Sequence, residues 1–307
     1  MTTSRQILLR LAAIGDWLFA QLFVALLRLI RLLPVDTALA IGGFFAGMLG
    51  RFLPADKTGY DNLRAAYPDL DEGEIRKILA GAWDSIGRVG VEYVFLDRIF
   101  DFDPENPNTG RIEAQGVDQF IEIANSDRPC IVFTAHLANW ELLAVCAATF
   151  NLDLSVLYRP PNNMYVARKL DEVRGSVMGD RIASRDGALI GMSAVLDRGG
   201  HIGMLVDQRF DRGPDIPFFG RPARTNPSLA KLARRFDARV YAARSIRLPD
   251  NRFRLELKGP LDLPRDADGE VDVRATTEMV TNIVEDWVRE HPDQWLWMHN
   301  RWRHRGE

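Results

Sequence analysis

The fold is decided by one stretch of the sequence, Pro129-Cys-Ile-Val-Phe-Thr-Ala135, a continuous apolar run that is followed at once by His136. A short run of this kind is typical of a strand buried on both faces of a parallel sheet. Two further strands are predicted at residues 152–158 and 201–206, and sequences of helical period lie between the three. This alternation predicts an α/β fold with a mostly parallel central sheet flanked by helices.

The remaining elements extend one domain, which we expect to span residues 55–307. Asp71 followed by Glu74 predicts a capping box at the start of a helix. A hairpin is expected to join residues 239–246 to residues 252–257. Helices are predicted within residues 56–102 and at residues 139–150, 163–175, 187–198, 227–236 and 274–290. In an open parallel sheet the functional site lies at the carboxyl ends of the strands.

Composition and charge narrow the class of protein. The chain has 307 residues, of which 47% are hydrophobic and 26% charged, and its formal net charge is −3. These values exclude a disordered or disulfide-framework protein and argue against a nucleic-acid partner. Cys130 and Cys146 lie in apolar stretches and are predicted to be buried thiols of a protein in a reducing compartment.

The first 54 residues differ from the rest of the chain. They contain five arginines but only two acidic residues, and they include two long apolar runs at residues 17–27 and 37–50. A basic, apolar segment on an acidic body is typical of a chain that contacts an anionic membrane surface. Residues 1–54 are therefore predicted to form a membrane-anchoring helical segment, a hairpin divided at Pro34.

The way in which this segment contacts a membrane is left open by the sequence. Neither run reaches the ~18–20 uncharged residues of a spanning helix, although residues 14–33 could span if Arg28 snorkels. Gly43 and Gly47 have the spacing that permits close helix contact. The two runs could also form buried core helices. A cleaved signal peptide is disfavoured, because an acidic residue interrupts the expected apolar region.

One constellation of residues carries the predicted chemistry: Thr134-Ala-His136-Leu-Ala-Asn139-Trp-Glu141. Each helical residue turns by ~100°, so positions five apart on one helix point ~140° apart. His136 and Glu141 can therefore meet only if His136 lies in the turn before the helix, directly after the strand. A carboxylate that orients an imidazole and stabilises its protonated form makes that imidazole a general base. The alternative is that His136 is a hydrogen-bonded structural histidine.

The chain resembles the lipid A biosynthesis lauroyl/myristoyl acyltransferases, within the lysophospholipid-acyltransferase-like superfamily. The resemblance begins with His136 and Glu141, which have Asn-Trp between them. The other matching segments are Asn62-Leu-Arg-Ala-Ala-Tyr-Pro68, Leu157-Tyr-Arg-Pro160, Asp207-Gln208, Pro217-Phe-Phe-Gly220 and Gln294-Trp-Leu-Trp-Met-His-Asn-Arg-Trp-Arg303. A nucleophile elbow, a P-loop, an H-E-x-x-H motif and a dinucleotide-binding motif are all missing from the sequence.

This resemblance implies transfer of a fatty acyl chain from acyl carrier protein, or from acyl-CoA, to a hydroxyl group of a glycolipid, without a further cofactor. His136 would deprotonate that hydroxyl, and Glu141 would hold and charge-balance His136. The residues expected to bind substrate are Arg159, Asn139, Asp207, Gln208 and, with the weakest match, Arg185. The enzyme is expected at the cytoplasmic face of the cell inner membrane.

Several alternatives stay open at this point. Arg159 could be a surface residue at a strand end, Asn139 a helix cap, and Asp207 and Gln208 turn residues. The acceptor could be a lipid A precursor, or else a lysophospholipid, an ornithine lipid or a mannosylated phosphatidylinositol. A function of a different class would be a non-catalytic membrane lipid-binding protein, against which the intact pair of His136 and Glu141 argues.

The C-terminal tail interleaves tryptophan with arginine. Aromatic rings beside arginines suit a membrane interface or an acidic partner. The alternative is that Trp295, Trp297 and Trp302 belong to the core while the arginines are solvated.

Overall fold

The computed structural model describes residues 3–107, 109–158, 163–167, 175, 178–183 and 187–302, and for residues 3–13 it gives the helical backbone alone. The chain begins with five helices: α1 (Thr3–Ile30), α2 (Val35–Gly50), α3 (Pro54–Ala66), α4 (Glu72–Glu92) and α5 (Leu96–Ile99). The elements that follow are β1 (Ile112–Gln115), α6 (Val117–Ala124), β2 (Cys130–Thr134), α7 (Glu141–Thr149), β3 (Leu154–Tyr158), β4 (Arg181–Ala183), α9 (Ala188–Asp197) and β5 (His201–Leu205). The chain continues with β6 (Asp215–Phe218), β7 (Arg221–Arg224), α10 (Ser228–Phe236), β8 (Arg239–Arg247), η1 (Pro249–Asn251), β9 (Phe253–Lys258), α11 (Val273–Glu290) and η2 (Pro292–Gln294).

A seven-stranded sheet with the strand order β1-β9-β8-β2-β5-β3-β4 forms the centre of the molecule. Its neighbouring strands are parallel, except for β8 and β9, which form the predicted antiparallel hairpin with η1 at its turn. The prediction of a mostly parallel sheet flanked by helices is therefore confirmed. Strands β1 and β4 and the small β6–β7 hairpin were not expected from the sequence.

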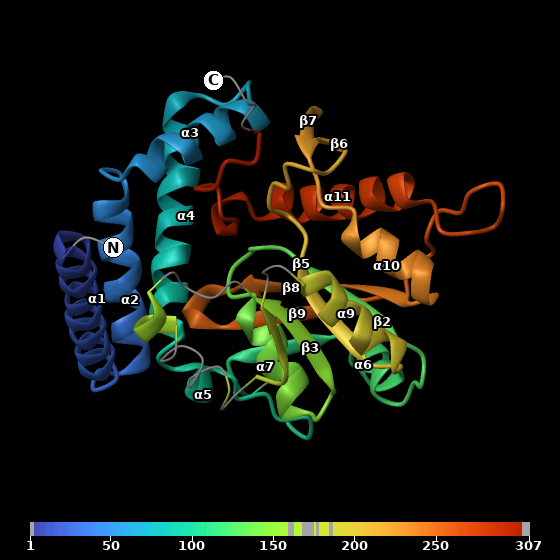
Figure 1. Cartoon of the computed structure of the whole chain (residues 1–307), viewed down its shortest axis with the longest axis horizontal. Coiled ribbons are helices and arrows are strands. Elements are labelled where there is room, and N and C mark those ends of the chain that lie inside the picture. The colour runs from blue at the N-terminus through green and yellow to red at the C-terminus, as the bar shows by residue number, and fades with distance from the viewer. Residues whose placement is uncertain are drawn as a thin grey trace.

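Both faces of the sheet are covered by helices (Figure 1). On one face, Ile131 and Phe133 of β2 belong to a core that includes buried residues of α9, α10 and α11. On the other face, Cys130 of β2 packs in a second core with Ala147 of α7. Because alternate residues of one strand enter different cores, β2 is apolar throughout, as the opening stretch of sequence indicated.

The N-terminal helices lie at one end of the molecule, where α2 packs along α4 (Figure 1). A Cβ atom at Gly42 would lie 2.4 Å from Cγ2 of Val91, and one at Gly43 would lie 2.1 Å from Oδ1 of Asp84. At Gly47 the nearest atom would be 4.0 Å away. The predicted close helix contact therefore occurs, with Gly42 and Gly43 at its centre and Gly47 at its margin.

The outer faces of α1 and α2 are apolar and uncovered. Leu22 and Leu29 of α1 are 72% and 63% exposed, and Phe44 of α2 is 64% exposed. Two buried core helices would not leave these side chains in solvent. Among the helices that the structure describes, none alone has both the length and the apolar composition to cross a membrane. Helices α2 and α3 satisfy the two requirements only together, across a bend of 85°.

Candidate active site

His136 lies in the turn that joins β2 to α7. Strand β2 ends at Thr134, and α7 begins at Glu141, so His136 precedes the helix as the sequence predicts. Within this turn Ala138 has a φ of 45°, a left-handed conformation that is uncommon for a residue with a side chain. The turn is therefore held in a specific shape by contacts with the rest of the molecule.

The imidazole of His136 is bound by the carboxylate of Asp207, which follows β5. Nδ1 of His136 lies 2.8 Å from Oδ1 of Asp207, and the backbone amide of His136 donates to Oδ2 of the same carboxylate at 2.8 Å. A carboxylate accepts hydrogen bonds, so this contact assigns the ring proton to Nδ1 and leaves Nε2 with its lone pair. A neutral His136 is thereby arranged to accept a proton at Nε2.

Asp207 is buried, with its side chain 0% exposed. Its Oδ2 atom also accepts a hydrogen bond of 2.8 Å from the indole nitrogen of Trp295. Burial by itself would raise the pKa of the Asp207 carboxyl, but the charge and hydrogen bonds of His136, together with the charge of His299, hold that pKa well below its usual range. Asp207 therefore stays ionised and can stabilise a proton on His136.

Glu141 lies on the first turn of α7 and lines the same cavity as His136. Its carboxylate accepts a hydrogen bond from the hydroxyl of Tyr93, and its backbone amide donates to Oδ1 of Asn139 at 3.1 Å. The carboxylate that contacts Nδ1 of His136 is that of Asp207, whereas the resemblance implied that Glu141 would hold the ring.

The other predicted contacts occupy different environments. Asn139 is buried, and its Oδ1 accepts from the amide of Glu141 two residues on, as in an Asx turn before α7, whose N-cap is Trp140. Gln208 is exposed, lines the cavity, and brings its side-chain nitrogen to 3.4 Å from Nε2 of His136. Arg159 and Arg185 lie outside the described residues.

The cavity beside His136 has a volume of about 330 Å³. Besides the polar side chains of His136, Glu141 and Gln208, its walls are mostly apolar and come from β2, β3, β5 and α7: Val132, Leu143, Ala144, Leu154, Val156, Leu157, Met204 and Leu205. Gly203 of β5 also lines it and contributes no side chain. The cavity therefore combines a basic nitrogen with a lining suited to a hydrocarbon chain.

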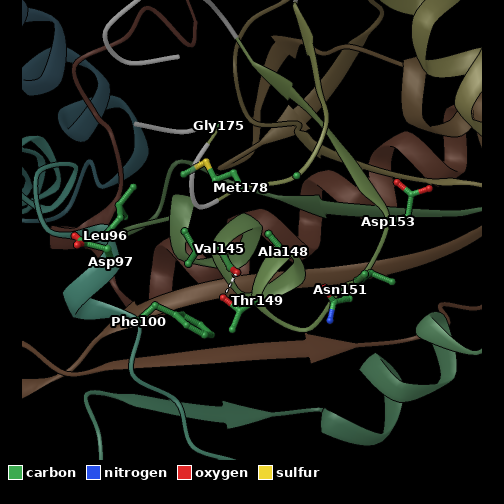
Figure 2. A pocket seen from close by; sticks show the side chains of 12 residues that line it. Leu96, Asp97, Phe100, Val145, Ala148, Thr149, Asn151, Asp153, Gly175 and Met178 are labelled. Atoms are coloured by element: carbon green, nitrogen blue, oxygen red, sulfur yellow. Dashed lines mark hydrogen bonds between the residues drawn. The ribbon is translucent and has the colours of Figure 1, made fainter. Parts of the chain in front are cut away.

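A second cavity, of about 520 Å³, lies beside α5 and α7 (Figure 2). Phe100, Val145, Thr149 and Met178 are among the residues that line it. None of the predicted site residues within the described part of the chain lines this cavity, so it is separate from the site at His136.

The C-terminal tail belongs to the core up to the last described residue. Trp295, Trp297 and Trp302 are all buried, which agrees with the core alternative and not with a membrane interface. The core alternative also expected solvated arginines, and for Arg301 this part is wrong, because Arg301 is 1% exposed. Its guanidinium donates to the backbone carbonyl of Arg224 and to Oγ1 of Thr225. Burial lowers the pKa of Arg301 to about 10, and Asp207 opposes this shift.

Comparisons of the sequence with known proteins identify the family. Residues 5–304 match the model of the family described as bacterial lipid A biosynthesis acyltransferase. The lipid A biosynthesis palmitoleoyltransferase of Escherichia coli (strain K12) is 23% identical over 283 residues, covering 89% of this chain and 87% of that protein. The lipid A biosynthesis acyltransferase of Shigella flexneri matches with the same identity and coverage. The chain therefore belongs to the bacterial lipid A biosynthesis acyltransferase family and is an acyltransferase.

Proposed function

We propose that this enzyme transfers a fatty acyl chain from acyl carrier protein to a hydroxyl group of a lipid A precursor. The observation that carries the proposal is the position of His136, which lies at 2.8 Å from the Asp207 carboxylate and lines an apolar cavity. The acceptor is supported by the two relatives, both of which are named as acyltransferases of lipid A biosynthesis.

His136 is the proposed general base. Its Nε2 atom takes the proton of the acceptor hydroxyl, and the hydroxyl oxygen attacks the carbonyl carbon of the acyl thioester. The new C–O bond forms as the C–S bond breaks, and the thiolate of the carrier leaves with the proton that His136 holds. No covalent intermediate on the enzyme is needed in this sequence of steps, so a nucleophilic side chain is not required.

Two carboxylates support His136 in this proposal. Asp207 holds the ring by Nδ1 and stabilises the imidazolium, which is an orienting role and not the substrate contact expected from the sequence. Glu141 adds a second negative charge from the first turn of α7, on the side of the cavity. Its hydrogen bond from Tyr93 fixes the direction of that carboxylate.

The substrate contacts follow from what lines the cavity. The apolar walls suit an acyl chain, and the amide of Gln208 beside Nε2 of His136 suits a contact with the hydroxyl or with the developing oxyanion. Arg159 and Arg185 remain proposed ligands for phosphate groups, because a guanidinium forks onto phosphate oxygens.

We place the enzyme on the cytoplasmic face of the inner membrane, bound through α1 and α2. The exposed leucines and phenylalanines of these helices form an apolar surface suited to the lipid interface. The side chain of Asn163, shortly after β3, donates to the Asp16 carbonyl of α1 at 3.0 Å. This contact ties α1, part of the proposed membrane surface, to the chain that follows β3, a strand that lines the cavity beside His136.

The function is tested with purified protein in detergent, an acyl carrier protein thioester and a lipid A precursor. Acylated lipid and free carrier thiol should appear in equal amounts, and acyl-CoA in place of the carrier thioester should give slower transfer. His136→Ala should lower the rate of transfer about 10²- to 10⁴-fold by removing the base, while the circular dichroism spectrum stays unchanged. Binding of lipid without release of thiol would instead support a lipid-binding protein.

The acceptor is tested in a strain from which the gene is deleted. Mass spectrometry of its total lipids should show lipid A lacking one acyl chain, and the wild-type gene should restore that chain. Loss of an acyl chain from a phospholipid or an ornithine lipid, with lipid A unchanged, would contradict the proposed acceptor.

A further inference from the structure

The tail segment Gln294–Leu296 is hydrogen bonded to the turn that carries His136. The amide of Ala138 donates to the carbonyl of Gln294 at 2.9 Å, and the amide of Leu296 donates to the carbonyl of His136 at 3.1 Å. Leu137 and Trp295 lie opposite one another as an isolated β-bridge. The backbone of the tail thus runs antiparallel to the turn and supports both sides of His136.

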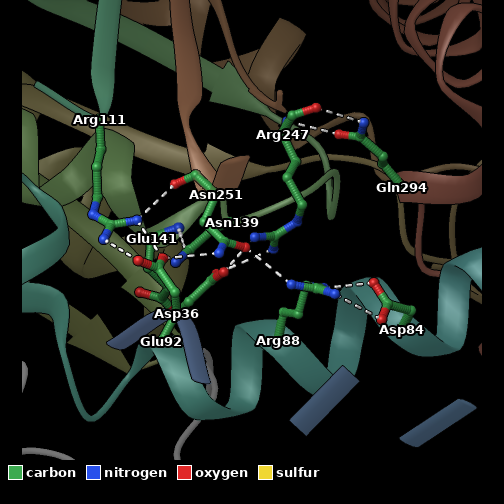
Figure 3. A network of polar contacts seen from close by, with 10 residues as sticks. All are labelled: Asp36, Asp84, Arg88, Glu92, Arg111, Asn139, Glu141, Arg247, Asn251 and Gln294. Atoms are coloured by element: carbon green, nitrogen blue, oxygen red, sulfur yellow. Dashed lines mark hydrogen bonds and ion pairs between the residues drawn. The ribbon is translucent and has the colours of Figure 1, made fainter. Parts of the chain in front are cut away.

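The tail is also anchored away from the site. The side chain of Gln294 accepts from the amide of Arg247 at 2.8 Å and donates to the carbonyl of the same residue at 2.9 Å (Figure 3). Asn62 of α3 donates its side-chain amide to the carbonyls of Trp297 and His299, at 2.8 and 2.6 Å. Neither anchor contributes a group to the proposed reaction, so both serve to hold the tail in place.

The side chain of Trp295 connects this anchored tail to Asp207. Its indole nitrogen donates to Oδ2 at 2.8 Å, and the ring is 1% exposed. The amide of His136 donates to the same oxygen, while Nδ1 of His136 contacts the other oxygen. Of the hydrogen bonds to the Asp207 side chain among the described residues, the one from Trp295 is therefore the only one that does not come from His136.

We infer that Trp295 is a positioning residue for the pair formed by His136 and Asp207. Together with the amide of His136, its N–H donor fixes the rotation of the carboxylate, so Oδ1 faces Nδ1, and it takes up part of the carboxylate's negative charge. The inference rests on the proposed role of His136 as general base. It assigns a role to the tail and to the segment that contains Asn62, which take no direct part in the proposed reaction.

The variant Trp295→Phe removes the donor and keeps an aromatic ring. Without the donor the carboxylate is less fixed, and a hydrogen bond to a charged group is lost, so kcat should fall about 10- to 100-fold. The KM for both substrates should stay within about threefold, because Trp295 does not line the cavity. A carboxylate with one donor fewer holds the His136 proton more strongly, so the acid limb of the pH–rate profile should move to higher pH.

Trp297 provides the matched control. It is also fully buried, and its indole nitrogen also donates a hydrogen bond, but the acceptor is the carbonyl of Pro292 at 2.6 Å. Trp297→Phe should lower the melting temperature about as much as Trp295→Phe while leaving kcat within about threefold and the pH profile in place. Equal losses of kcat in the two variants, without a shifted pH profile, would overturn the positioning role.

A spectroscopic measurement separates this inference from the proposed function, because it needs no substrate. The proton shared between Nδ1 of His136 and Asp207 should give a downfield proton resonance in the NMR spectrum, one that disappears in His136→Gln. In Trp295→Phe this resonance should shift or broaden, whereas in Trp297→Phe it should not change. An unchanged resonance in a folded Trp295→Phe protein would overturn the inference even if acyl transfer is confirmed. A shifted resonance in a protein that fails to transfer acyl chains would leave the inference standing and overturn the function.

If Trp295→Phe does not fold, Gln294→Met tests the same tail. Methionine matches the length of glutamine but cannot bond to the backbone of Arg247, so the tail should loosen without a change at Asp207 itself. The resonance should broaden and kcat should fall, with KM unchanged. A folded Gln294→Met protein with wild-type kcat and a wild-type resonance would contradict the role of the tail.

Discussion

His136 and Asp207 occupy equivalent places on neighbouring parallel strands: each lies two residues beyond a pair in register, Thr134 of β2 and Leu205 of β5. The backbone of one strand extends beyond Thr134 to present an imidazole, and the backbone of the other extends beyond Leu205 to present a carboxylate. The 2.8 Å contact between Nδ1 and Oδ1 follows from this register. Parallel strands that end together at one edge of a sheet thus build the acid–base pair.

Asp207→Asn tests the orienting carboxylate. The amide keeps the shape of the side chain, but it carries no charge to stabilise imidazolium and can favour the wrong tautomer of His136. We expect kcat to fall about 10²- to 10⁴-fold with the fold retained. Asp197→Asn, at the exposed end of α9, is the matched control and should have wild-type kinetics. A kcat near the wild-type value in Asp207→Asn would remove this carboxylate from the mechanism.

Glu141 and His136 are tested as a pair by a double-mutant cycle. If Glu141 stabilises the charge that His136 acquires, Glu141→Gln should lower kcat sharply, while Glu141→Gln combined with His136→Ala should be little worse than His136→Ala alone. A second cycle, with Asp207→Asn in place of Glu141→Gln, should likewise give a double variant whose kcat is little lower than that of His136→Ala alone. Losses that simply multiply would identify Glu141 as a separate substrate contact.

Much of this site could be predicted from the sequence, because local sequence patterns determine the strand before His136 and the helix that contains Glu141. The apolar run before His136 determines a buried strand, and the position of Glu141 in the next helix follows from the helical period. The place of His136 in the turn between them was therefore predicted correctly. The capping box at Asp71 and Glu74 was predicted in the same way and is present.

The partner of His136 could not be predicted, because it depends on which strands are neighbours. Asp207 was recognised as a polar residue at a strand end, but nothing local states that β5 pairs with β2. The hydrogen bond from Trp295 depends on a still longer connection, across 88 residues of chain. From the sequence, Trp295 could lie at a membrane interface or in the core. Only the tertiary structure shows that its indole nitrogen contacts the carboxylate of Asp207.

His299 should make the stability of the protein depend on pH. Burial lowers the pKa of its imidazole below the ordinary value of 6.5, against the opposing charge of Asp207. The unfolded chain therefore binds a proton before the folded protein does, so the free energy of unfolding falls as the pH decreases through about 6.5. His299→Asn can still donate to the carbonyl of Leu296, the partner of Nδ1, but does not titrate.

Thermal unfolding of wild type and His299→Asn at about pH 7.5 and about pH 5.5 measures this effect. The wild type should lose more stability than His299→Asn between these two pH values. His201, whose pKa burial also lowers, is present in both proteins, so its contribution cancels in the comparison. Equal losses in the two proteins would show that His299 does not titrate in this range.

Gly42 and Gly47 test the packing of α2 on α4. A Cβ at Gly42 would lie 2.4 Å from Cγ2 of Val91 and 3.0 Å from the carbonyl oxygen of Gly87, neither of which is the end of a flexible side chain. Gly42→Ala should therefore destabilise the protein by about 1–3 kcal/mol. Gly47→Ala has room and gains helix propensity, so it should be neutral or stabilising by up to ~1 kcal/mol. Chemical denaturation of both variants gives the comparison, and equal effects would contradict the close contact.

The apolar surface of α1 is tested best by substitution. Deleting residues 1–54 would uncover the side of α4 that α2 covers, so a loss of membrane binding could then arise from misfolding. Leu22, Leu26 and Leu29 of α1 are at least 53% exposed, and changing all three to glutamine leaves the core intact. Each exposed leucine buried in lipid contributes about 1.5–3 kcal/mol, so the triple variant should bind vesicles containing anionic lipid more than about tenfold more weakly.

Two exposed apolar residues on α6 provide the control for this experiment. Val117 and Ile121 are 45% and 51% exposed but belong to the α/β body. Val117→Gln combined with Ile121→Gln changes surface hydropathy without touching α1, so co-sedimentation with vesicles should stay at the wild-type level. Both variants should unfold at the wild-type temperature, because none of the changed side chains is buried. If the α1 variant sediments with vesicles as the wild type does, or if the α6 variant is the one released, α1 is not the membrane-binding surface.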